Sequence, residues 1–320
     1  MSFSNKIYGS LIGYAIGDAL GRGTEFMTQQ EAALRYPDGL TDYSQIIRDA
    51  HRIRWRRGEY TTDTRAVLEM AESMIECNYI DYRHFAIRYK KWFDTQQPDD
   101  FDSHIRMVFQ DKNFVDDPHG ICRKYYELSN VFEAPNEVLG RALLVGFWPH
   151  DIEQAVIDNC RITHWDTRCV AAAMITATMA NELLWHRREV DYDHLTGIAA
   201  RIDKRVLPFL EVARNGDISD FDLDDEGSDW YVRKNMGVAL WVLWHHTDPA
   251  EALYDVIGHG GDSNTNAALT MGLMGLKYGY SRMSRHLIDT LIGKEYIYDV
   301  ADRLIDTLLH ADDGADTDDN

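Results

Sequence analysis

Four consecutive side chains with oxygen atoms follow a pair of glycines near the C-terminal end of the chain. The glycines are Gly260 and Gly261, and the residues that follow are Asp262, Ser263, Asn264 and Thr265. An apolar segment rich in small residues comes next, so the pattern predicts a helix that begins at these side chains. Carboxylate and hydroxyl oxygens there could hold a hard cation, and the free backbone N–H groups could hold a phosphate. An ordinary capped helix after a glycine turn would show the same residues.

A second polar cluster opens another predicted helix. It consists of Thr61, Thr62, Asp63 and Thr64. Apolar residues follow at helical spacing over residues 67–75, so the cluster stands where a buried helix begins. Capping by Thr61 or Thr62 would explain part of this cluster, but not four oxygen-bearing side chains in a row.

A third cluster precedes the longest apolar segment of the chain, residues 170–185. Thr163, His164 and Asp166 form a polar turn there. A lone His before a helix is usually a cap or a packing residue, but this one repeats the arrangement of the other two clusters. The segment contains threonines and Asn181 and is short for a membrane span, so a buried central helix is predicted.

The N-terminal segment carries glycines at a four-residue interval. Residues 7–20 are predicted to form a helix, and the glycines are Gly9, Gly13, Gly17 and Gly21. This spacing leaves one helix face smooth, so that another helix can approach it closely. Glu25 follows in a polar turn, either as a solvated surface acid or as a ligand that points back into the core.

Helical patterns cover most of the remaining chain, and alternating strand patterns are almost absent. Further helices are predicted over residues 81–95, 101–110, 119–130, 151–161, 192–214, 232–246, 281–289 and 296–309. No linker divides the chain. We therefore expect an all-α fold, a single compact multi-helix bundle over residues 1–310. The acidic residues 311–320 are predicted to be a disordered tail whose aspartates bind no metal.

Composition excludes several classes of function. The net charge of -20 and the isoelectric point near 4.9 argue against general nucleic-acid binding. The 4 cysteines include no C-x-x-C pair and are interpreted as reduced thiols. The N-terminus has no cleavable apolar core, so a cytoplasmic protein with no membrane segment is expected.

Two other segments could suggest a function. Residues 51–57, HRIRWRR, form a basic island that could contact phosphates with Trp55 as a stacking surface, although such a run is more often a solvated face. Residues 222–227 imitate the start of a calcium-binding loop, but Arg233 stands where its bidentate Glu should be. No zinc-hydrolase, serine-hydrolase or P-loop motif is present.

The three clusters together point to a known family. The sequence resembles the ADP-ribosylglycohydrolase family, which includes dinitrogenase-reductase-activating glycohydrolase and the ADP-ribosyl-acceptor hydrolases. The similarity runs from GSLIGYAIGDALGRGTEF at residues 9–26 through YTTDT at 60–64 and ITHWD at 162–166 to GGDSNTNAALTMGLMG at 260–275. The resemblance implies an all-α bundle with a binuclear magnesium centre at the floor of an ADP-ribose cleft.

The sequence departs from the family pattern at the metal motifs. The family's Thr-Asp-Asp-Thr is Thr61-Thr62-Asp63-Thr64 here, so Thr62 replaces a carboxylate. The family's Gly-Gly-Asp-Thr-Asp-Thr is residues 260–265, where Asn264 replaces the metal-bridging carboxylate. A third family segment, Asn-Gly-Ala-Leu-Met-Arg, is matched only loosely by residues 140–145 before Pro149.

These departures change the expected metal content. Two adjacent dications repel strongly, and a neutral Asn cannot bridge them as a carboxylate would. One Mg²⁺ or Mn²⁺ ion is therefore predicted rather than two, and a site without metal is the alternative. The predicted metal ligands are Glu25, Thr61, Thr62, Asp63, Asp262, Asn264 and Thr265. The resemblance implies that Glu25, Asp63 and Asp262 are catalytic, and that Thr163, His164, Gly260, Gly261 and Ser263 contact the ligand.

The leading functional hypothesis is a hydrolase that cleaves the bond between ADP-ribose, or a related riboside, and an acceptor. Its partners would be ADP-ribose or an ADP-ribosylated macromolecule. A catalytically silent relative that binds ADP-ribose or a nucleotide is the alternative, because two acidic ligands are lost. A structural helical protein whose polar turns are only caps is the third possibility. The sequence does not predict the acceptor, the linkage or the oligomeric state.

Overall fold

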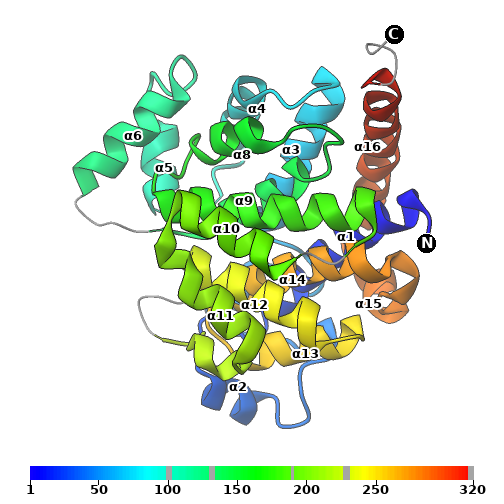
Figure 1. The fold of residues 1–320 in the computed structure, drawn as a ribbon. Helices are drawn as coiled ribbons and strands as arrows, with labels where there is room; N and C mark the ends of the chain where they lie inside the picture. Colours follow the sequence, from blue (N-terminus) through cyan, green and yellow to red (C-terminus); the bar gives the residue numbers. More distant parts are fainter. Residues whose placement is uncertain (99–102, 130–133, 189–190, 226–230, 316–320) are drawn as a thin grey trace.

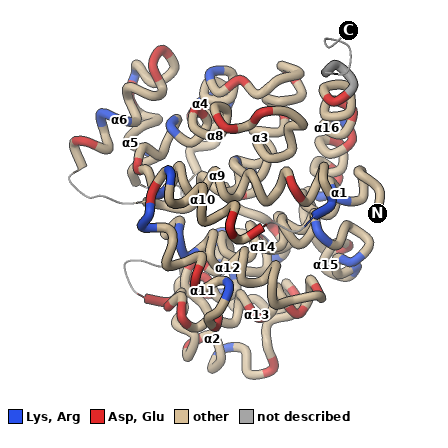
Figure 2. The backbone as a smooth tube through the Cα atoms, viewed as in Figure 1, with Lys and Arg blue, Asp and Glu red and all other residues tan. Residues whose placement is uncertain are grey.

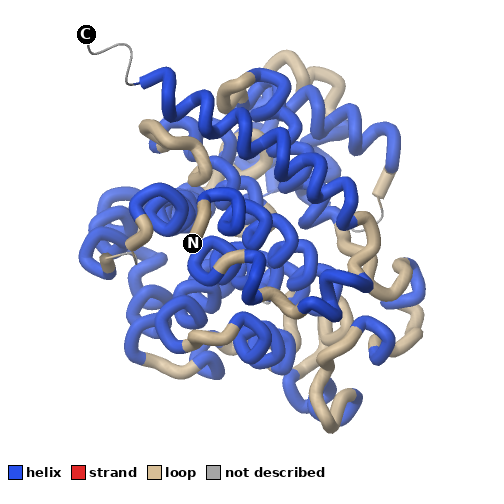
Figure 3. The backbone as a smooth tube through the Cα atoms, turned by 90° about the vertical axis from the view of Figure 1, so that its right-hand side faces the viewer, coloured by secondary structure: helices blue, strands red, loops and turns tan. Residues whose placement is uncertain are grey.

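The computed structural model describes residues 1–98, 103–129, 134–188, 191–225 and 231–315. Its helices are α1 (Phe3–Gly21), α2 (Gln29–Arg35), α3 (Thr62–Cys77), α4 (Tyr82–Gln96), α5 (Ser103–Gln110), α6 (Pro118–Ser129), α7 (Val138–Val145), α8 (Glu153–Cys160), α9 (Thr167–Asn181), α10 (Tyr192–Ile202), α11 (Leu207–Asn215), α12 (Val232–His245), α13 (Pro249–Gly258), α14 (Ser263–Tyr278), α15 (Arg285–Thr290) and α16 (Lys294–Ala315). Short 3₁₀ turns at Tyr43–Gln45, Arg52–Arg54, Lys204–Val206, Ile218–Phe221 and Tyr280–Arg282, and a π turn at Glu182–His186, complete the elements. The described residues contain no strand, which confirms the predicted all-α class (Figure 3).

Most of the predicted helices are present, but their bounds differ in places. The predicted helix over residues 192–214 is two helices, α10 and α11. Asp203 ends α10 with an extended backbone, and its side chain accepts a hydrogen bond from the N–H of Arg205, which starts a new turn. Helices α2 and α7 were not predicted. Helix α16 continues to Ala315, and residues 316–320 of the predicted tail lie outside the described residues, so the domain boundary stays a prediction.

Helices α1 and α14 pack antiparallel with their backbones almost in contact. A Cβ atom on Gly13 would lie 2.5 Å from the carbonyl oxygen of Met271, and one on Gly17 would lie 2.2 Å from that of Ala267. Neither position has space for a side chain, which confirms the smooth glycine face predicted for α1. The contact continues to Gly21, so the C-terminal end of α1 lies against the first residues of α14.

Helix α9 crosses the middle of the molecule in Figure 1, with α3, α4 and α8 on one side and α12 and α13 on the other. It packs against α7, α8, α10 and α12. Ala171, Ala172 and Ala173 are fully buried in it, so it is the central helix that its apolar sequence predicts. None of the helices in the described residues has both the length and the apolar character that a membrane span requires.

Helix α3 is fixed to its neighbours by two buried glutamates. Glu72 accepts hydrogen bonds of 2.9 Å from the Tyr296 hydroxyl and of 2.8 and 2.7 Å from the Arg303 guanidinium, both on α16. Glu69 forms an ion pair of 2.7 Å with Arg88 on α4. The α3 helix is therefore held on two sides, and its N-terminus is fixed relative to the core.

The charged residues are spread over the whole fold (Figure 2), and the cysteines are free thiols as predicted from the sequence. Figure 2 shows Asp and Glu on elements throughout the chain, interspersed with Lys and Arg. All four cysteines are free thiols, and Cys122, Cys160 and Cys169 are buried. Burial raises the pKa of Cys160 to about 12, so this thiol stays protonated and unreactive.

Candidate metal and ligand site

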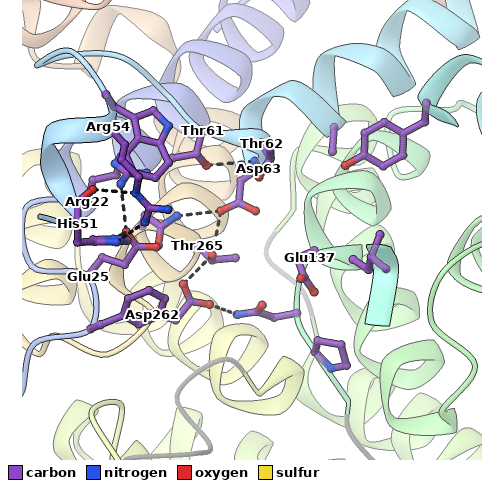
Figure 4. A pocket seen from close by; sticks show the side chains of 18 residues that line it. Arg22, Glu25, His51, Arg54, Thr61, Thr62, Asp63, Glu137, Asp262 and Thr265 are labelled. Atoms are coloured by element: carbon purple, nitrogen blue, oxygen red, sulfur yellow. Dashed lines mark hydrogen bonds and ion pairs between the residues drawn. The ribbon is translucent and has the colours of Figure 1, made fainter. Parts of the chain in front are cut away.

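A cleft of about 300 Å³ opens where the end of α1 meets the first residues of α3 and α14. The segment just before α7 and the turn at Arg52–Arg54 complete its walls (Figure 4). All of the metal ligands predicted from the sequence line this cleft, namely Glu25, Thr61, Thr62, Asp63, Asp262, Asn264 and Thr265. Three segments that are far apart in the sequence therefore meet at one cavity.

Asp18 fixes the start of α3 at this cleft. It is fully buried on α1, and its Oδ2 accepts hydrogen bonds from the backbone N–H of Thr61 at 2.8 Å and of Thr64 at 3.2 Å. These N–H groups belong to the first turn of α3, which has no acceptors of its own for them. Desolvation raises the pKa of Asp18, although these hydrogen bonds oppose the shift. The carboxylate thus aims Thr61, Thr62 and Asp63 into the cleft.

Two carboxylates at the floor of the cleft share one hydroxyl group. Thr265 Oγ1 lies 2.9 Å from Asp63 Oδ2 and 2.8 Å from Asp262 Oδ1. A hydroxyl has one proton, so it can donate to only one of these oxygens at a time. Burial, followed by the charges of Asp18 and Asp262, raises the pKa of Asp63 well above its ordinary value. The two carboxylates are therefore joined by a neutral hydroxyl, in a place where burial and neighbouring negative charge disfavour an ionised Asp63.

Asn264 adds a neutral oxygen to this group. Its Nδ2 donates to Asp63 Oδ2 at 3.1 Å, whereas its buried Oδ1 has no hydrogen-bond partner among the described residues. A buried oxygen without a partner costs free energy unless a ligand or a water completes its contacts. Asn136 donates to the remaining Asp262 oxygen at 2.7 Å, which fixes the orientation of that carboxylate.

This donor set fits one hard cation. Mg²⁺ prefers carboxylate, hydroxyl and amide oxygens, usually with several waters. Asp63, Asp262, Thr265 and the Asn264 oxygen supply that chemistry, and a cation would offset the charge that raises the Asp63 pKa. Within the described part of the chain, no group of three or more His, Cys, Asp or Glu could hold a metal. The set therefore supports a site in which neutral oxygens and waters complete the coordination.

Glu25 lies in the same cleft, but its carboxylate contacts basic side chains and not the cluster of Asp63, Asp262 and Thr265. Its Oε2 is 2.6 Å from His51 Nε2 and 3.5 Å from an Arg22 nitrogen. The Glu25 side chain is only 10% exposed to solvent, so the Arg22 guanidinium and the His51 ring stabilise its carboxylate where little water reaches it. Glu25 is thus paired with basic groups at one side of the cleft, and Asp63 and Asp262 form the floor beside it (Figure 4).

The basic island at residues 51–57 reaches the cleft through part of its length. His51, Arg54 and Trp55 line the cavity, and the Trp55 ring centre is 3.2 Å from the Arg22 guanidinium and 4.5 Å from that of Arg54. Arg52 has a structural role, because its Nε donates at 2.9 Å to two carbonyl oxygens at the end of α1. The two alternatives for this run therefore apply to different residues: Arg54, Arg56 and Arg57 are exposed, whereas Arg52 is buried and His51 and Trp55 are half-buried.

Comparison with known proteins identifies the family and the fold. A profile of the ADP-ribosylglycohydrolase family matches residues 1–314. The chain belongs to the ADP-ribosylglycohydrolase family. It is 22% identical over 311 residues to an ADP-ribosylarginine hydrolase of Serratia proteamaculans, covering 94% of this chain and 79% of the relative. It is 24% identical over 279 residues to the ADP-ribosyl-[dinitrogen reductase] glycohydrolase of Rhodospirillum rubrum, covering 87% of each.

The family fold is also seen in solved structures. An ADP-ribosylglycohydrolase-related protein complex superposes with a TM-score of 0.72 over 96% of this chain and 99% of that chain, at 20% identity. Within this fold the two departures from the family's metal motifs, Thr62 and Asn264, both line the cleft. The two positions at which the sequence is expected to depart from the family's metal motifs therefore lie at the cleft and not on a distant surface.

Three of the predicted ligand contacts have packing roles instead. Gly260 and Gly261 have φ angles of 69° and 63°, and a Cβ on Gly261 would lie 1.9 Å from the Leu223 carbonyl oxygen. The N–H of Gly261 donates to the Met27 carbonyl at 2.8 Å, which fastens the loop after α1 to the start of α14. Ser263 is fully buried and donates to the Gly21 carbonyl at 2.7 Å. None of the three predicted contacts lines this cleft or the adjoining cavity.

Thr163 and His164 lie in a second cavity of about 260 Å³, which adjoins the cleft at Pro135. Both side chains are buried and hydrogen-bonded to protein groups.

Asn136 and Glu137, which line the cleft from the segment before α7, were not identified from the sequence. Residues 140–145, which match a third family segment only loosely, lie inside the buried helix α7. An Asn-Glu pair before a short helix carries no signal of its own that would have shown its role.

Proposed function

We propose that the protein hydrolyses the glycosidic bond between ADP-ribose, or a related riboside, and an acceptor, with one Mg²⁺ or Mn²⁺ ion. The observation that carries the proposal is the pair Asp63 and Asp262 around the single Thr265 hydroxyl, with the Asn264 oxygen beside them. In a fold shared with ADP-ribosyl hydrolases, this group supports a site where a hard cation and a ribose would meet. The four free cysteines support a cytoplasmic location for the enzyme.

Asp63, Asp262, Thr265 and Asn264 would hold the ion, which when bound would supply Lewis-acid polarisation of a ribose oxygen or a water. Glu25 orients the attacking water and accepts its proton, because its carboxylate is fixed by His51 beside the floor of the cleft. The new bond forms between the water oxygen and C1″ of the ribose. The bond from C1″ to the acceptor breaks, and its electron pair leaves with the acceptor.

The basic and aromatic side of the cleft supports the assignment of an ADP-ribosyl ligand. Arg22 and Arg54 lie on the Trp55 ring at the cavity wall, so guanidinium donors and an aromatic surface occur together. Guanidinium groups bind phosphate oxygens, and an aromatic ring stacks on a nucleobase. We therefore assign the diphosphate to these residues, in place of Thr163 and His164.

A catalytically silent ADP-ribose-binding protein is the second candidate. It is favoured by one observation, the neutral side chains of Thr62 and Asn264 at positions where the family pattern has carboxylates. A protein of this kind would keep the cleft and the basic wall but would not accelerate hydrolysis.

A thermal melt with and without magnesium and ADP-ribose tests the binding part of the proposal. Ligands that bind only the folded state raise the melting temperature, so the largest shift is expected when both are present. Asp262→Ala should remove the magnesium-dependent part of the shift. Asp306→Asn, which removes an exposed carboxylate on α16, should leave it unchanged.

Release of ADP-ribose from arginine-, serine- and nucleic-acid-linked substrates separates the two candidates. The enzyme should release ADP-ribose from at least one of them, and Asp262→Ala should slow that release by about a hundredfold or more. Binding without release from any substrate would favour the silent protein. The absence of both binding and release would contradict the proposal.

A further inference from the structure

A chain of hydrogen-bonded side chains leads from a buried cation to the cleft. Arg141 is fully buried on α7 and donates to Thr163 Oγ1. Thr163 Oγ1 is 2.7 Å from His164 Nδ1, and His164 Nε2 is 3.3 Å from Glu137 Oε2. Glu137 is 28% exposed and lines the cleft, so the chain ends at a carboxylate that a ligand can reach.

The two ends of this series fix the direction of its hydrogen bonds, because a guanidinium only donates and a carboxylate only accepts. A neutral His164 ring that donates to Glu137 carries its proton on Nε2, so Nδ1 is an acceptor. The Thr163 hydroxyl then donates to His164 Nδ1, and its oxygen accepts from Arg141. Burial and the charge of Arg141 lower the pKa of His164 well below its ordinary value, which agrees with a neutral ring.

Glu137 is therefore held as a hydrogen-bond acceptor by groups that do not face the solvent. The side chain of Arg141 also interacts with the Asn159 carbonyl at 3.2 Å, and neither contact gives its charge a carboxylate partner. The hydrogen-bonded series from Arg141 through Thr163 and His164 to Glu137, called the relay below, connects the buried positive charge to the Glu137 carboxylate. Each of these two charges therefore stabilises the other through the relay. In the view of Figure 4, Glu137 and Glu25 lie on opposite sides of the group formed by Asp63 and Asp262.

We propose that Glu137 is a further catalytic carboxylate, whose negative charge stabilises the positive charge that develops on the ribose ring as the C1″ bond breaks. The electron pair of that bond leaves with the acceptor, and Glu137 forms no bond and exchanges no proton. Arg141, Thr163 and His164 are positioning residues that keep the carboxylate fixed as a hydrogen-bond acceptor. The assignment rests on the proposed function, and it gives Thr163 and His164 a role other than ligand contact.

The test compares two ligands that differ in ring charge. One is ADP-ribose, and the other is an ADP conjugate of a hydroxylated pyrrolidine, whose protonated ring nitrogen imitates the charge of the transition state. The wild-type protein should bind the cationic compound about a hundredfold tighter than ADP-ribose by calorimetry. Glu137→Gln should reduce this preference by about tenfold or more and lower kcat by a similar factor, with little change in affinity for ADP-ribose.

The controls separate this role from a structural one. Glu137 makes no capping hydrogen bond at the start of α7, so Glu137→Gln should melt like the wild type. Glu153→Gln, an exposed carboxylate on α8, should keep the preference for the cationic compound. A Glu137→Gln protein with an undiminished preference would overturn the role of Glu137 alone. A wild-type protein that binds neither compound would overturn the proposed function as well.

A second measurement tests the positioning residues without turnover. Nitrogen chemical shifts of His164 should show a proton on Nε2 and none on Nδ1, because the Thr163 hydroxyl donates to Nδ1. Thr163→Val removes that donor, so the shifts should report a mixture of tautomers and the preference for the cationic compound should fall. A wild-type His164 protonated on Nδ1 would contradict the relay.

Discussion

Asp18 and Thr61 are joined by a hydrogen bond of 2.8 Å between a buried carboxylate oxygen and a backbone N–H. The bond connects α1 to the first turn of α3 across 43 residues of sequence. The same oxygen accepts from the Thr64 hydroxyl at 2.6 Å, so one carboxylate replaces the missing acceptors of a helix N-terminus. The position of Asp63 in the cleft therefore depends on a residue that does not line it.

Asp18→Ala should destabilise the protein by about 2–4 kcal/mol, because it leaves buried N–H groups and a hydroxyl without an acceptor. Asp18→Asn keeps one acceptor oxygen and should cost less. The free energy of unfolding from urea titrations measures both. The magnesium-dependent thermal shift should decrease more in Asp18→Ala than in Asp18→Asn. An Asp18→Ala protein with wild-type stability would show that α3 is held by other contacts.

Gly17→Ala tests the close packing of α1 on α14. The new Cβ would lie 2.2 Å from the Ala267 carbonyl oxygen, so the helices must separate, at a cost of about 1–3 kcal/mol. Gly197→Ala on α10 is a matched control, since a Cβ there meets nothing within 4 Å. It should leave stability unchanged or raise it by up to about 1 kcal/mol. Equal effects of the two substitutions in thermal melts would contradict the packing argument.

The fold could be predicted from local patterns, because helical spacing and the glycine interval are properties of neighbouring residues. Two polar clusters, at residues 61–64 and 262–265, also predicted which floor residues meet, since each stands where a buried helix begins. The third cluster was expected at the same place, but Thr163 and His164 line the adjoining cavity. The walls could not be predicted in the same way. Asn136 and Glu137 gain their roles from Asp262 and His164, which are far away in the sequence.

Glu72→Gln should destabilise the protein in a pH-dependent way. Hydrogen bonds from Arg303, the largest cause, hold the pKa of Glu72 below its ordinary value of 4.5. A carboxylate with a lowered folded-state pKa contributes stability above its unfolded pKa, and this contribution is lost as the pH falls through the folded pKa. We expect a loss of about 1–2 kcal/mol at pH 7, because Arg303 is partly in water.

Denaturation of the wild type and of Glu72→Gln between pH 3 and pH 8 measures this difference. It should be constant near neutral pH and decrease below about pH 4.5. Asp299→Asn removes an exposed partner of the same Arg303 and should cost less than about 0.5 kcal/mol. A difference that grows as the pH falls would contradict the assignment of the ion pair.

Thr62→Asp combined with Asn264→Asp should restore the carboxylates of the family pattern. Without metal, the added negative charges near Asp63 and Asp262 should lower the melting temperature. With magnesium, the added carboxylates should tighten magnesium binding by about tenfold or more. The double variant should then have a higher melting temperature than the wild type, the reverse of the order without metal. ADP-ribose release that appears only in the double variant would show that the natural site was disabled. An unchanged response to magnesium would place these side chains outside the ion's reach.

Phe26 offers a test of strain at the cleft. It lines the cavity with a φ of 59°, and 58% of its surface is exposed. A left-handed aromatic residue costs about 1–2 kcal/mol, whereas Asn adopts this conformation easily. Phe26→Asn should therefore raise the free energy of unfolding by about 1 kcal/mol and weaken ADP-ribose binding. Leu34→Asn, exposed on α2 outside the cleft, should leave binding unchanged.

The backbone contact between α1 and α14 also limits which sequences can replace this one. A library with random codons over residues 9–21 should yield folded survivors that retain glycine at every fourth position, together with Asp18. The same contact would reject a side chain at Gly275, on the facing helix, where a Cβ would lie 2.1 Å from the Gly9 carbonyl oxygen. Side chains that line the cleft without packing between helices, such as Thr62, could thus be exchanged at a lower cost in stability than these glycines.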